Sequence, residues 1–487
     1  AKMREILPKW DKFERSEHTA AEAKKEYPSN PYKHELIDEF SKEGKKLSFY
    51  KSGNYTDLCK GGHLSSMKKV KPDSFKLTSI AGAYWRGSEK NPMLTRIYAV
   101  AFPTNKELDE YLKQKEEAEK RDHRKIGKEL DLFSFSEISP GSPFFHPKGA
   151  FMFIALQSFL RDLYPSWGYQ EVITPLIYGA DLWKTSGHWD HFREHMFDVT
   201  MDHKEAALKP MNCPSHILIY KTKARSYRDL PLRITDFAPL HRNELKGTLG
   251  GLMRVRKFSQ DDCHVFCTPE QVKQEIKSLI RNATYVYKDV FGFDFDVELS
   301  TKPDKAMGDP KLWEIAENSL REALEESGLK YKLNPGAGAF YGPKIDFHIK
   351  DALGRSWQCG TEQLDFQQPQ RFNVEYTGAD NAPHIAVMLH RTVIGSVERF
   401  LGILIEHFAG KFPLWLSPVQ IRILTVADRF NDYAEKLKQK FDSHNLRVEV
   451  DSNTETISKK VYNAEIERIP LILVVGEKEE ANNTVAV

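Results

Sequence analysis

The sequence has little of the chemistry that marks several protein classes. Its five cysteines are scattered and odd in number, which favours a reducing, cytoplasmic setting over a disulfide framework. No apolar run approaches the ~18 residues of a membrane span, and the first residues lack the apolar core of a signal peptide. The net charge of +2 neither requires nor excludes nucleic acid. A Walker A loop is absent, and residues 336–342 match a dinucleotide fingerprint only loosely.

Residues 241–266 are the most informative segment, and their pattern predicts two strands joined by a glycine-rich loop. One face of the second strand would carry Arg254, Arg256, Phe258, Gln260, Asp262 and His264. Arg242 and Glu244 share a face of the first strand. A solvated charged face would give the same alternation. An ordinary hairpin has an apolar inner face, so this surface predicts the floor of a site for a polyanionic, aromatic ligand such as ATP.

The chain length of 487 residues favours about three domains. We expect a first domain over 1–103, a charged connecting helix over 104–133, a large mixed domain over 134–415 and a last domain over 416–487. Thr104 and Glu107 form a capping box at the start of the connecting helix, whose basic residues either face solvent or meet a phosphate backbone. From residue 416, strands alternate with helices, which predicts a parallel α/β sheet.

Five motifs in a fixed order carry a family resemblance. They are KPMNCPSH (209–216), GLMRVRKFSQDDCH (251–264), GAFYGPKIDF (338–347), WQCGTEQLDF (357–366) and HRTVIGSVERF (390–400). Together they resemble the bacterial-type threonyl-tRNA synthetases, which are class II aminoacyl-tRNA synthetases. The resemblance implies an α+β multidomain protein: an antiparallel catalytic sheet flanked by helices, a C-terminal α/β anticodon-binding domain and an N-terminal partial editing domain. It also implies that the chain is shortened at both ends.

The same resemblance implies activation of L-threonine by ATP, with Mg²⁺, and transfer of the threonyl group to tRNA(Thr). Both reactants are anionic, so catalysis would depend on positioning and charge neutralisation. The implied ATP site consists of Arg242, Glu244, Arg254, Phe258, Gln358 and Arg399. Arg242 and Arg399 would be catalytic, with Arg242 on the α-phosphate and Arg254 and Arg399 on the distal phosphates. Phe258 and Arg399 would enclose the adenine, and Glu244 would accept from its amine. The alternative is that these arginines make ion pairs within the protein.

A zinc site is also implied by the resemblance, with Cys213, His264 and His390 as ligands and one ion per chain. Three protein ligands leave a coordination position open, which would let threonine bind through its hydroxyl and exclude valine. The rest of the implied substrate pocket is Met211, Gln260, Asp262, Tyr341 and Thr361, with Lys344 and Gln363 around it. Thr392 stands where the family often has alanine. The local cluster Cys263, His264 and Cys267 is an alternative, although alternation puts Cys263 and His264 on opposite faces.

Asp57, Cys59 and His63, with AGAYWRG (81–87), resemble the second half of the family's serine-editing domain. The His-x3-His pair of that domain is missing upstream, so we expect an incomplete editing remnant. Cys59 and His63 could instead be half of a zinc site.

GYQEVITPLI (168–177), with Pro175, resembles the first class II motif and implies a homodimer. Three other functions fit parts of the sequence: a prolyl or seryl synthetase, a synthetase-derived RNA-binding regulator, and a free-standing nucleotide-binding module. The widely spaced zinc ligands argue against a prolyl enzyme, and the retained motif arginines argue against the regulator. The tRNA-type last domain argues against the free-standing module.

Overall fold

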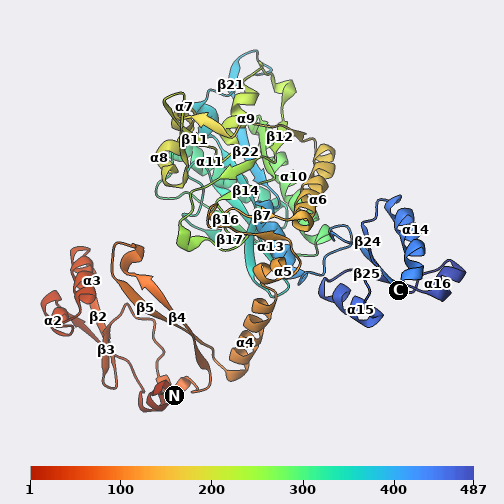
Figure 1. Ribbon diagram of the computed structural model, residues 1–487. Helices are drawn as coiled ribbons and strands as arrows, with labels where there is room; N and C mark the ends of the chain where they lie inside the picture. Colours follow the sequence, from red (N-terminus) through yellow and green to blue (C-terminus); the bar gives the residue numbers. More distant parts are fainter. Residues whose placement is uncertain (1) are drawn as a thin grey trace. The chain divides into compact units, whose positions relative to one another are not determined.

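The computed structural model describes residues 2–487. Its backbone contacts divide the chain into two compact units, Ala1–Glu117 and Ala118–Val487 (Figure 1). Among the described residues, no helix combines the length and the apolar character that a membrane crossing needs.

The first unit contains two separate antiparallel sheets. One has the order β1 (Glu14–His18), β2 (Leu47–Ser52), β3 (Tyr55–Leu58), and the other pairs β4 (Phe75–Tyr84) with β5 (Met93–Ala101). Helices α2 (Ala20–Lys25) and α3 (Pro31–Lys42) pack on the first sheet and bury Ala23 and Ile37 against Phe49. A short helix, α1 (Lys2–Ile6), precedes them.

The expected single connecting helix is two helices. α4 (Asn105–Lys120) begins at the predicted capping box, where Glu107 N donates to Thr104 Oγ1 at 3.2 Å. It ends before Asp122, whose non-helical backbone (φ −51°, ψ 121°) and side chain cap the new helix α5 (His123–Glu129). The expectation of one continuous helix was wrong because Asp122 accepts from Arg124 N at 2.8 Å and starts a second helix.

The second unit is built on an eight-stranded sheet. Its order is β17 (Tyr331–Asn334), β16 (Asp294–Ser300), β18 (Lys344–Lys350), β19 (Ser356–Asp365), β22 (Val387–Thr392), β15 (Asp262–Cys267), β12 (Leu232–Asp236) and β8 (Gln170–Glu171). The pairs from β16 to β12 are antiparallel, and only the two edge strands run parallel to their neighbours. The antiparallel catalytic sheet expected from the sequence is therefore present.

Helices cover one face of this sheet and form the main core with it. They are α6 (Pro147–Leu163), α10 (Val272–Thr284), α11 (Pro310–Glu326) and α13 (Val397–His407). In β15, Cys263, Val265 and Cys267 join this core, whereas the alternate residues Asp262 and His264 lie on the opposite face. The alternation that predicted opposite faces for Cys263 and His264 is confirmed.

The predicted long hairpin over 241–266 is interrupted. β13 (Pro239–His241) pairs with β14 (Lys257–Ser259), but β15 is a separate strand that pairs with β12 and β22. The break falls at Asp261, whose buried carboxylate accepts from Val393 N at 2.6 Å and Gly395 N at 2.9 Å. These contacts turn the Asp261 side chain into the core. The residues between the paired strands, 242–256, form the β13–β14 loop.

Shorter elements complete the second unit. They are β6 (Phe133–Ser134), β7 (Phe144–Phe145), β9 (Ile177–Gly179), α7 (Ala180–Ser186), α8 (His188–His191), β10 (Asp198–Met201), β11 (Lys204–Leu208), α9 (Cys213–Tyr220), α12 (Gln367–Arg371), β20 (Glu375–Thr377) and β21 (Pro383–Ile385). β21 and β22 are separated at Ala386, which is buried in a second core cluster with α9.

The C-terminal part has the predicted parallel sheet. β23 (Ile421–Thr425) lies between β24 (Val448–Asp451) and β25 (Leu471–Val475), and both pairs are parallel. The crossover helices are α14 (Asn431–Asp442) and α15 (Ile457–Ile466), and α16 (Glu477–Asn482) follows the last strand. Ile421, Ile423 and Leu473 form its core.

Candidate active site

A cavity of about 580 Å³ opens on the polar face of the eight-stranded sheet. Its walls come from β14, β15, β18, β19, β22, α13 and the β13–β14 loop. All residues expected to take part in activation line it: Met211, Cys213, Arg242, Glu244, Arg254, Phe258, Gln260, Asp262, His264, Tyr341, Gln358, Thr361, His390 and Arg399. The fold therefore gathers five motifs that lie far apart in the sequence around one space large enough for a nucleotide and an amino acid.

Two of the three arginines expected to bind ATP have no carboxylate partner. Arg242 Nε donates to Pro210 O at 3.2 Å, and its guanidinium lies 5.1 Å from the centre of the Phe258 ring. Arg399 donates to Met253 O and Gln358 O, both at 3.0 Å. Neither forms an ion pair within residues 2–487, and burial lowers the pKa of Arg242. Two fixed cations without an internal counter-charge form a site ready for an anion.

Arg254 differs, because it is paired with another residue of the expected ATP site. Its guanidinium lies 2.7 Å from a Glu244 carboxylate oxygen. The Arg254 side chain is 50% exposed and that of Glu244 is 14% exposed, so water screens the pair. The alternative that the arginines make ion pairs thus describes Arg254, but neither Arg242 nor Arg399. Arg256 does not line the cavity, and its Nε donates to Glu244 O at 2.9 Å.

Cys213, His264 and His390 converge at one end of the cavity. One ligand atom from each residue lies within 4.8 Å of the others, and all three residues are buried. His264 Nε2 and His390 Nδ1 face each other at 3.0 Å. Burial raises the pKa of the Cys213 thiol and keeps that of His264 well below its usual value. A buried thiolate needs a cation beside it and a neutral imidazole is a metal ligand, so this donor set fits zinc.

The local alternative for the metal centre is wrong. Cys263 and Cys267 lie in the core on the other side of β15 from His264. Cys263 Sγ contacts Thr235 Oγ1 at 3.2 Å. These two cysteines therefore serve as small apolar core residues.

Three buried residues that sequence reasoning did not assign hold the site together. Asp365 accepts from His390 Nε2 at 2.9 Å and so orients that ring. His216 Nδ1 lies 2.7 Å from His264 Nδ1. Asp346 contacts Thr361 Oγ1 at 3.1 Å and Gln358 Nε2 at 2.6 Å. All three stand inside the family-like motifs, and this membership is the only signal the sequence offered.

The remaining substrate-pocket candidates are fixed by neighbours. Asp262 accepts from Asn212 Nδ2 at 3.0 Å, and burial raises the pKa of Asp262 to about 6. The Tyr341 ring stacks on His390 with centroids 4.7 Å apart, and its hydroxyl donates to Gln363. Thr392 Oγ1 is buried at the cavity wall without a hydrogen-bond partner among residues 2–487. Asp262 and Tyr341 are thus held in place by neighbouring side chains.

The editing candidates lie in the first unit and do not form a comparable cluster. Asp57 makes a salt bridge of 2.7 Å with Lys33, and it also binds the Tyr27 hydroxyl. The His63 ring stacks on Phe13 with centroids 4.2 Å apart. Cys59 Sγ accepts from Gly61 N at 3.5 Å. Within residues 2–487, no hydrogen bond joins any two of Asp57, Cys59 and His63.

Three family models match successive parts of the chain. The class II tRNA synthetase core domain (G, H, P, S and T) matches residues 197–408, and the anticodon binding domain matches 420–487. The second additional domain of threonyl and alanyl tRNA synthetases matches residues 47–98. A Giardia lamblia prolyl-tRNA synthetase has the same fold, with a TM-score of 0.60 at 19% identity over 76% of this chain and 72% of that chain. Fold and cavity thus define a class II aminoacyl-tRNA synthetase.

Closer relatives narrow the class to one family. Threonine–tRNA ligase from Caldanaerobacter subterraneus is 52% identical over 98% of this chain and 73% of that protein. The Clostridium botulinum (strain Kyoto) ligase is 53% identical over 100% of this chain and 76% of that protein. A structure of the RNA binding domain of threonyl-tRNA synthetase from Cryptosporidium parvum has a TM-score of 0.73 at 44% identity, covering 75% of this chain and 92% of that chain. The chain belongs to the threonyl-tRNA synthetase family.

Proposed function

We propose that this chain activates L-threonine with ATP and transfers the threonyl group to tRNA(Thr). The observation that carries the proposal is the pair of cavity arginines, Arg242 and Arg399, whose guanidinium groups donate only to backbone carbonyls. A carboxylate that attacks a triphosphate is an anion that approaches an anion. Fixed cations are the groups that such a reaction requires.

In the first step, a carboxylate oxygen of threonine attacks the α-phosphorus of ATP. The new oxygen–phosphorus bond forms as the bond to pyrophosphate breaks, and pyrophosphate leaves with the electron pair. Arg242 would neutralise the α-phosphate, and Arg399 and Arg254 the departing pyrophosphate. No side chain has to form a covalent bond, because positioning and charge neutralisation are sufficient. Mg²⁺ would enter with ATP.

Arg254 and Glu244 have separate roles in this scheme, although they are paired in this structure. Arg254 would turn to the distal phosphates, and Glu244 would accept a hydrogen bond from the adenine amine, with Phe258 and Gln358 beside the base. Opening the half-exposed pair costs about 1 kcal/mol or less. ATP can therefore separate the two side chains at little expense of affinity.

Cys213, His264 and His390 would hold one zinc ion at the threonine end of the cavity. When bound, zinc offers an open coordination position to the substrate hydroxyl, which valine lacks. Asp365 fixes the His390 ring through Nε2, which leaves Nδ1 facing His264. The amino acid would lie among Met211, Gln260, Asp262, Tyr341 and Thr361.

Pyrophosphate exchange with ATP and each of threonine, serine, valine and proline tests this function. Threonine should support the fastest exchange. Serine, which keeps the hydroxyl, should support a slower one, and valine and proline should support almost none. Faster exchange with proline than with threonine would overturn the proposal and indicate a prolyl-tRNA synthetase instead.

We further propose a homodimer formed through residues 168–177. Ile173, Leu176 and Ile177 in this segment are 88%, 38% and 43% exposed, and together they form an apolar surface that a partner subunit would cover. Light scattering should give a mass near twice 56.2 kDa. A fully active monomer at assay concentration would contradict this arrangement.

For the first unit, we propose that Asp57, Cys59 and His63 are the part of a serine-editing site that this chain contains. The proposal is supported by the match of residues 47–98 to the second additional domain. General acid–base hydrolysis needs its groups within hydrogen-bond reach of the ester, so we expect poor clearance of Ser-tRNA(Thr). Rapid deacylation by the chain alone, lost on Cys59→Ala, would contradict that expectation.

A further inference from the structure

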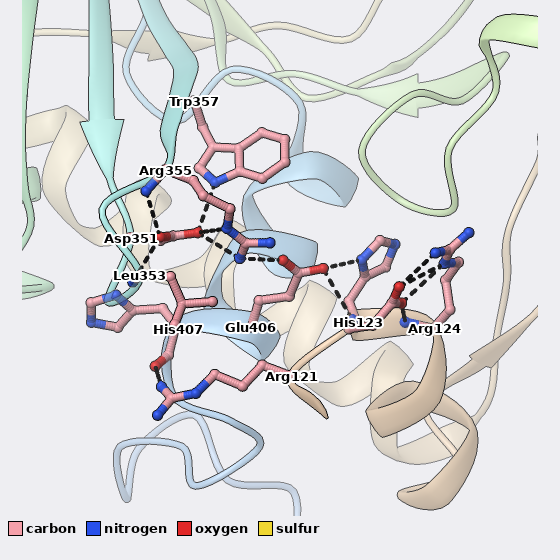
Figure 2. Close-up of polar contacts among 10 residues, drawn as sticks. Arg121, His123, Arg124, Asp351, Leu353, Arg355, Trp357, Glu406 and His407 are labelled. Atoms are coloured by element: carbon pink, nitrogen blue, oxygen red, sulfur yellow. Dashed lines mark hydrogen bonds and ion pairs between the residues drawn. The ribbon is translucent and has the colours of Figure 1, made fainter. Parts of the chain in front are cut away.

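A buried histidine outside the cavity connects the start of α5 to the helix that carries Arg399. His123 Nδ1 lies 2.6 Å from Glu406 Oε1, and His123 N donates to the same oxygen at 3.1 Å. The two side chains are 4% and 6% exposed. Figure 2 shows the pair at the centre of a network of polar contacts. His123 is the first buried residue of the second unit in chain order.

The other ring nitrogen of His123 binds the β13–β14 loop. Leu252 N donates to His123 Nε2 at 3.0 Å. Since a backbone N–H can only donate, Nε2 is the acceptor, and the ring proton lies on Nδ1 and points to Glu406. Asp122, His123 and Glu406 offer ligand atoms within 4.8 Å of one another. However, both ring nitrogens are already used, and Asp122 binds Arg124. The cluster is therefore a hydrogen-bond relay and not a metal centre.

The loop is shaped to receive this imidazole. Gly251 has φ +56°, and a Cβ atom there would lie 2.2 Å from His123 Nε2. Only glycine fits both the left-handed backbone and the close approach. On its other side the loop is held by Arg399 Nε, which donates to Met253 O at 3.0 Å. The segment between the two ATP-site candidates Glu244 and Arg254 is thus fixed from α5 and from α13.

Glu406 is itself anchored, so the relay does not end at a mobile side chain. Its Oε2 accepts from Arg355 Nη2 at 2.5 Å, and Arg355 also pairs with Asp351 at 2.6 Å. Trp357 Nε1 donates to Asp351 at 3.0 Å (Figure 2). Trp357 directly precedes the cavity residue Gln358 in β19. Glu406 lies about two helical turns after Arg399 in α13.

We propose that His123 is a positioning residue for ATP: through Leu252 N–H it holds the β13–β14 loop in the conformation that presents Glu244 and Arg254, and Glu406 fixes its tautomer. This inference rests on the proposed function, because it assigns the loop to ATP. This role would make α5 part of the ATP-binding site. Helix α5 follows directly on α4, which spans the boundary between the two units.

Two substitutions separate the contacts of the ring. His123→Asn keeps a donor near the Nδ1 position but loses the acceptor for Leu252, whereas His123→Gln places an amide oxygen near the Nε2 position. The matched control is His146→Asn. Like His123, His146 has its Nδ1 2.6 Å from a carboxylate oxygen, that of Asp131, but its Nε2 contacts Ser134 Oγ and not the β13–β14 loop. The measurements are KM for ATP, KM for threonine and kcat in pyrophosphate exchange, together with zinc content and the thermal midpoint.

His123→Asn should raise KM for ATP by about fivefold or more, because a buried N–H loses its partner, and leave KM for threonine within about twofold. Zinc content should stay unchanged, His123→Gln should recover most of the ATP affinity, and His146→Asn should have no effect. A lower thermal midpoint with an unchanged KM for ATP, or an equal rise in both KM values, would overturn the inference.

If His123→Asn does not fold, Gly251→Ala gives a second test, since the added methyl group displaces the loop from the imidazole. The same selective loss of ATP affinity is expected, and an unchanged KM for ATP would refute the role of the contact. Absence of threonine-dependent exchange in the unaltered chain would instead refute the proposed function, so the two failures are distinguishable.

Discussion

Replacing Arg242 by glutamine should abolish most of the activity without weakening the fold. In the free protein the Arg242 side chain is partly buried, has no carboxylate partner within residues 2–487, and donates to Pro210 O at 3.2 Å. Burial lowers its pKa, which means that the protein environment disfavours its charge. Loss of the charge should therefore change the free energy of unfolding by only about 1 kcal/mol, in either direction.

The effect on the reaction should be much larger. In the transition state, Arg242 would face the phosphorus at which negative charge develops, from a partly buried position. Removal of one such preorganised donor lowers kcat by about 10²–10³, or about 2.7–4 kcal/mol. Arg254→Gln should cost about tenfold or less, because that side chain is 50% exposed and its charge is screened. Arg256→Gln is the matched control, since Arg256 stands in the same loop but does not line the cavity.

Pyrophosphate exchange and thermal unfolding, each with and without ATP, provide the assay. Arg242→Gln should keep its thermal midpoint but lose most of the increase that ATP gives to the unaltered protein. Two results would refute the reasoning. One is a large fall of the midpoint without ATP, which would make the lost activity a folding defect. The other is an equal, small loss at Arg242, Arg254 and Arg256, which would place the ATP site elsewhere.

Three further outcomes are expected. Cys213→Ser should reduce bound zinc, measured by atomic absorption, and abolish threonine-dependent exchange while ATP binding persists; full exchange by a metal-free protein would exclude the zinc site. Burial raises the pKa of Glu406, but hydrogen bonds from His123 outweigh it and hold that pKa below 4.5. The ionised Glu406 carboxylate therefore stabilises the folded chain above pH 4.5, and this stabilisation is lost as the pH falls through the folded-state pKa. The difference in thermal midpoint between the unaltered chain and Glu406→Gln should therefore shrink in acid. Ile173→Glu should halve the mass measured by light scattering, and an unchanged mass would remove residues 168–177 from the interface.

The sequence predicted the architecture because its signals were local. Alternation identified the opposite faces of β15, a capping box marked the start of α4, and strand–helix alternation marked the C-terminal parallel sheet. The break between β14 and β15 could not be predicted in this way. It depends on Asp261 accepting from Val393 N and Gly395 N, residues more than a hundred positions away along the chain.

In the candidate site, too, contacts between residues far apart in the chain could not be predicted from local sequence signals. The motifs indicated which residues gather in the cavity, but not which of them bind each other in the free protein. The pairing of Arg254 with Glu244 follows from the path of the β13–β14 loop. The contact of Asp365 with His390 follows from the neighbouring positions of β19 and β22 in the sheet. Side-chain partners across strands depend on register, which spacing alone does not specify.

In the proposed ATP site, the Arg254–Glu244 ion pair would make the binding of the two ends of ATP interdependent. A ligand that carries only the base would bind Glu244 and release Arg254, and a ligand that carries only the phosphates would bind Arg254 and release Glu244. Each half-ligand alone must overcome the whole attraction between the two side chains, and the second then binds to a partner already released. Adenosine and tripolyphosphate should therefore bind with positive cooperativity, limited to about fivefold by the strength of a half-exposed pair. Arg254→Gln should abolish the coupling. In the unaltered chain, the coupling would favour ATP, in which the base and the phosphates are covalently joined, over a mixture of adenosine and tripolyphosphate.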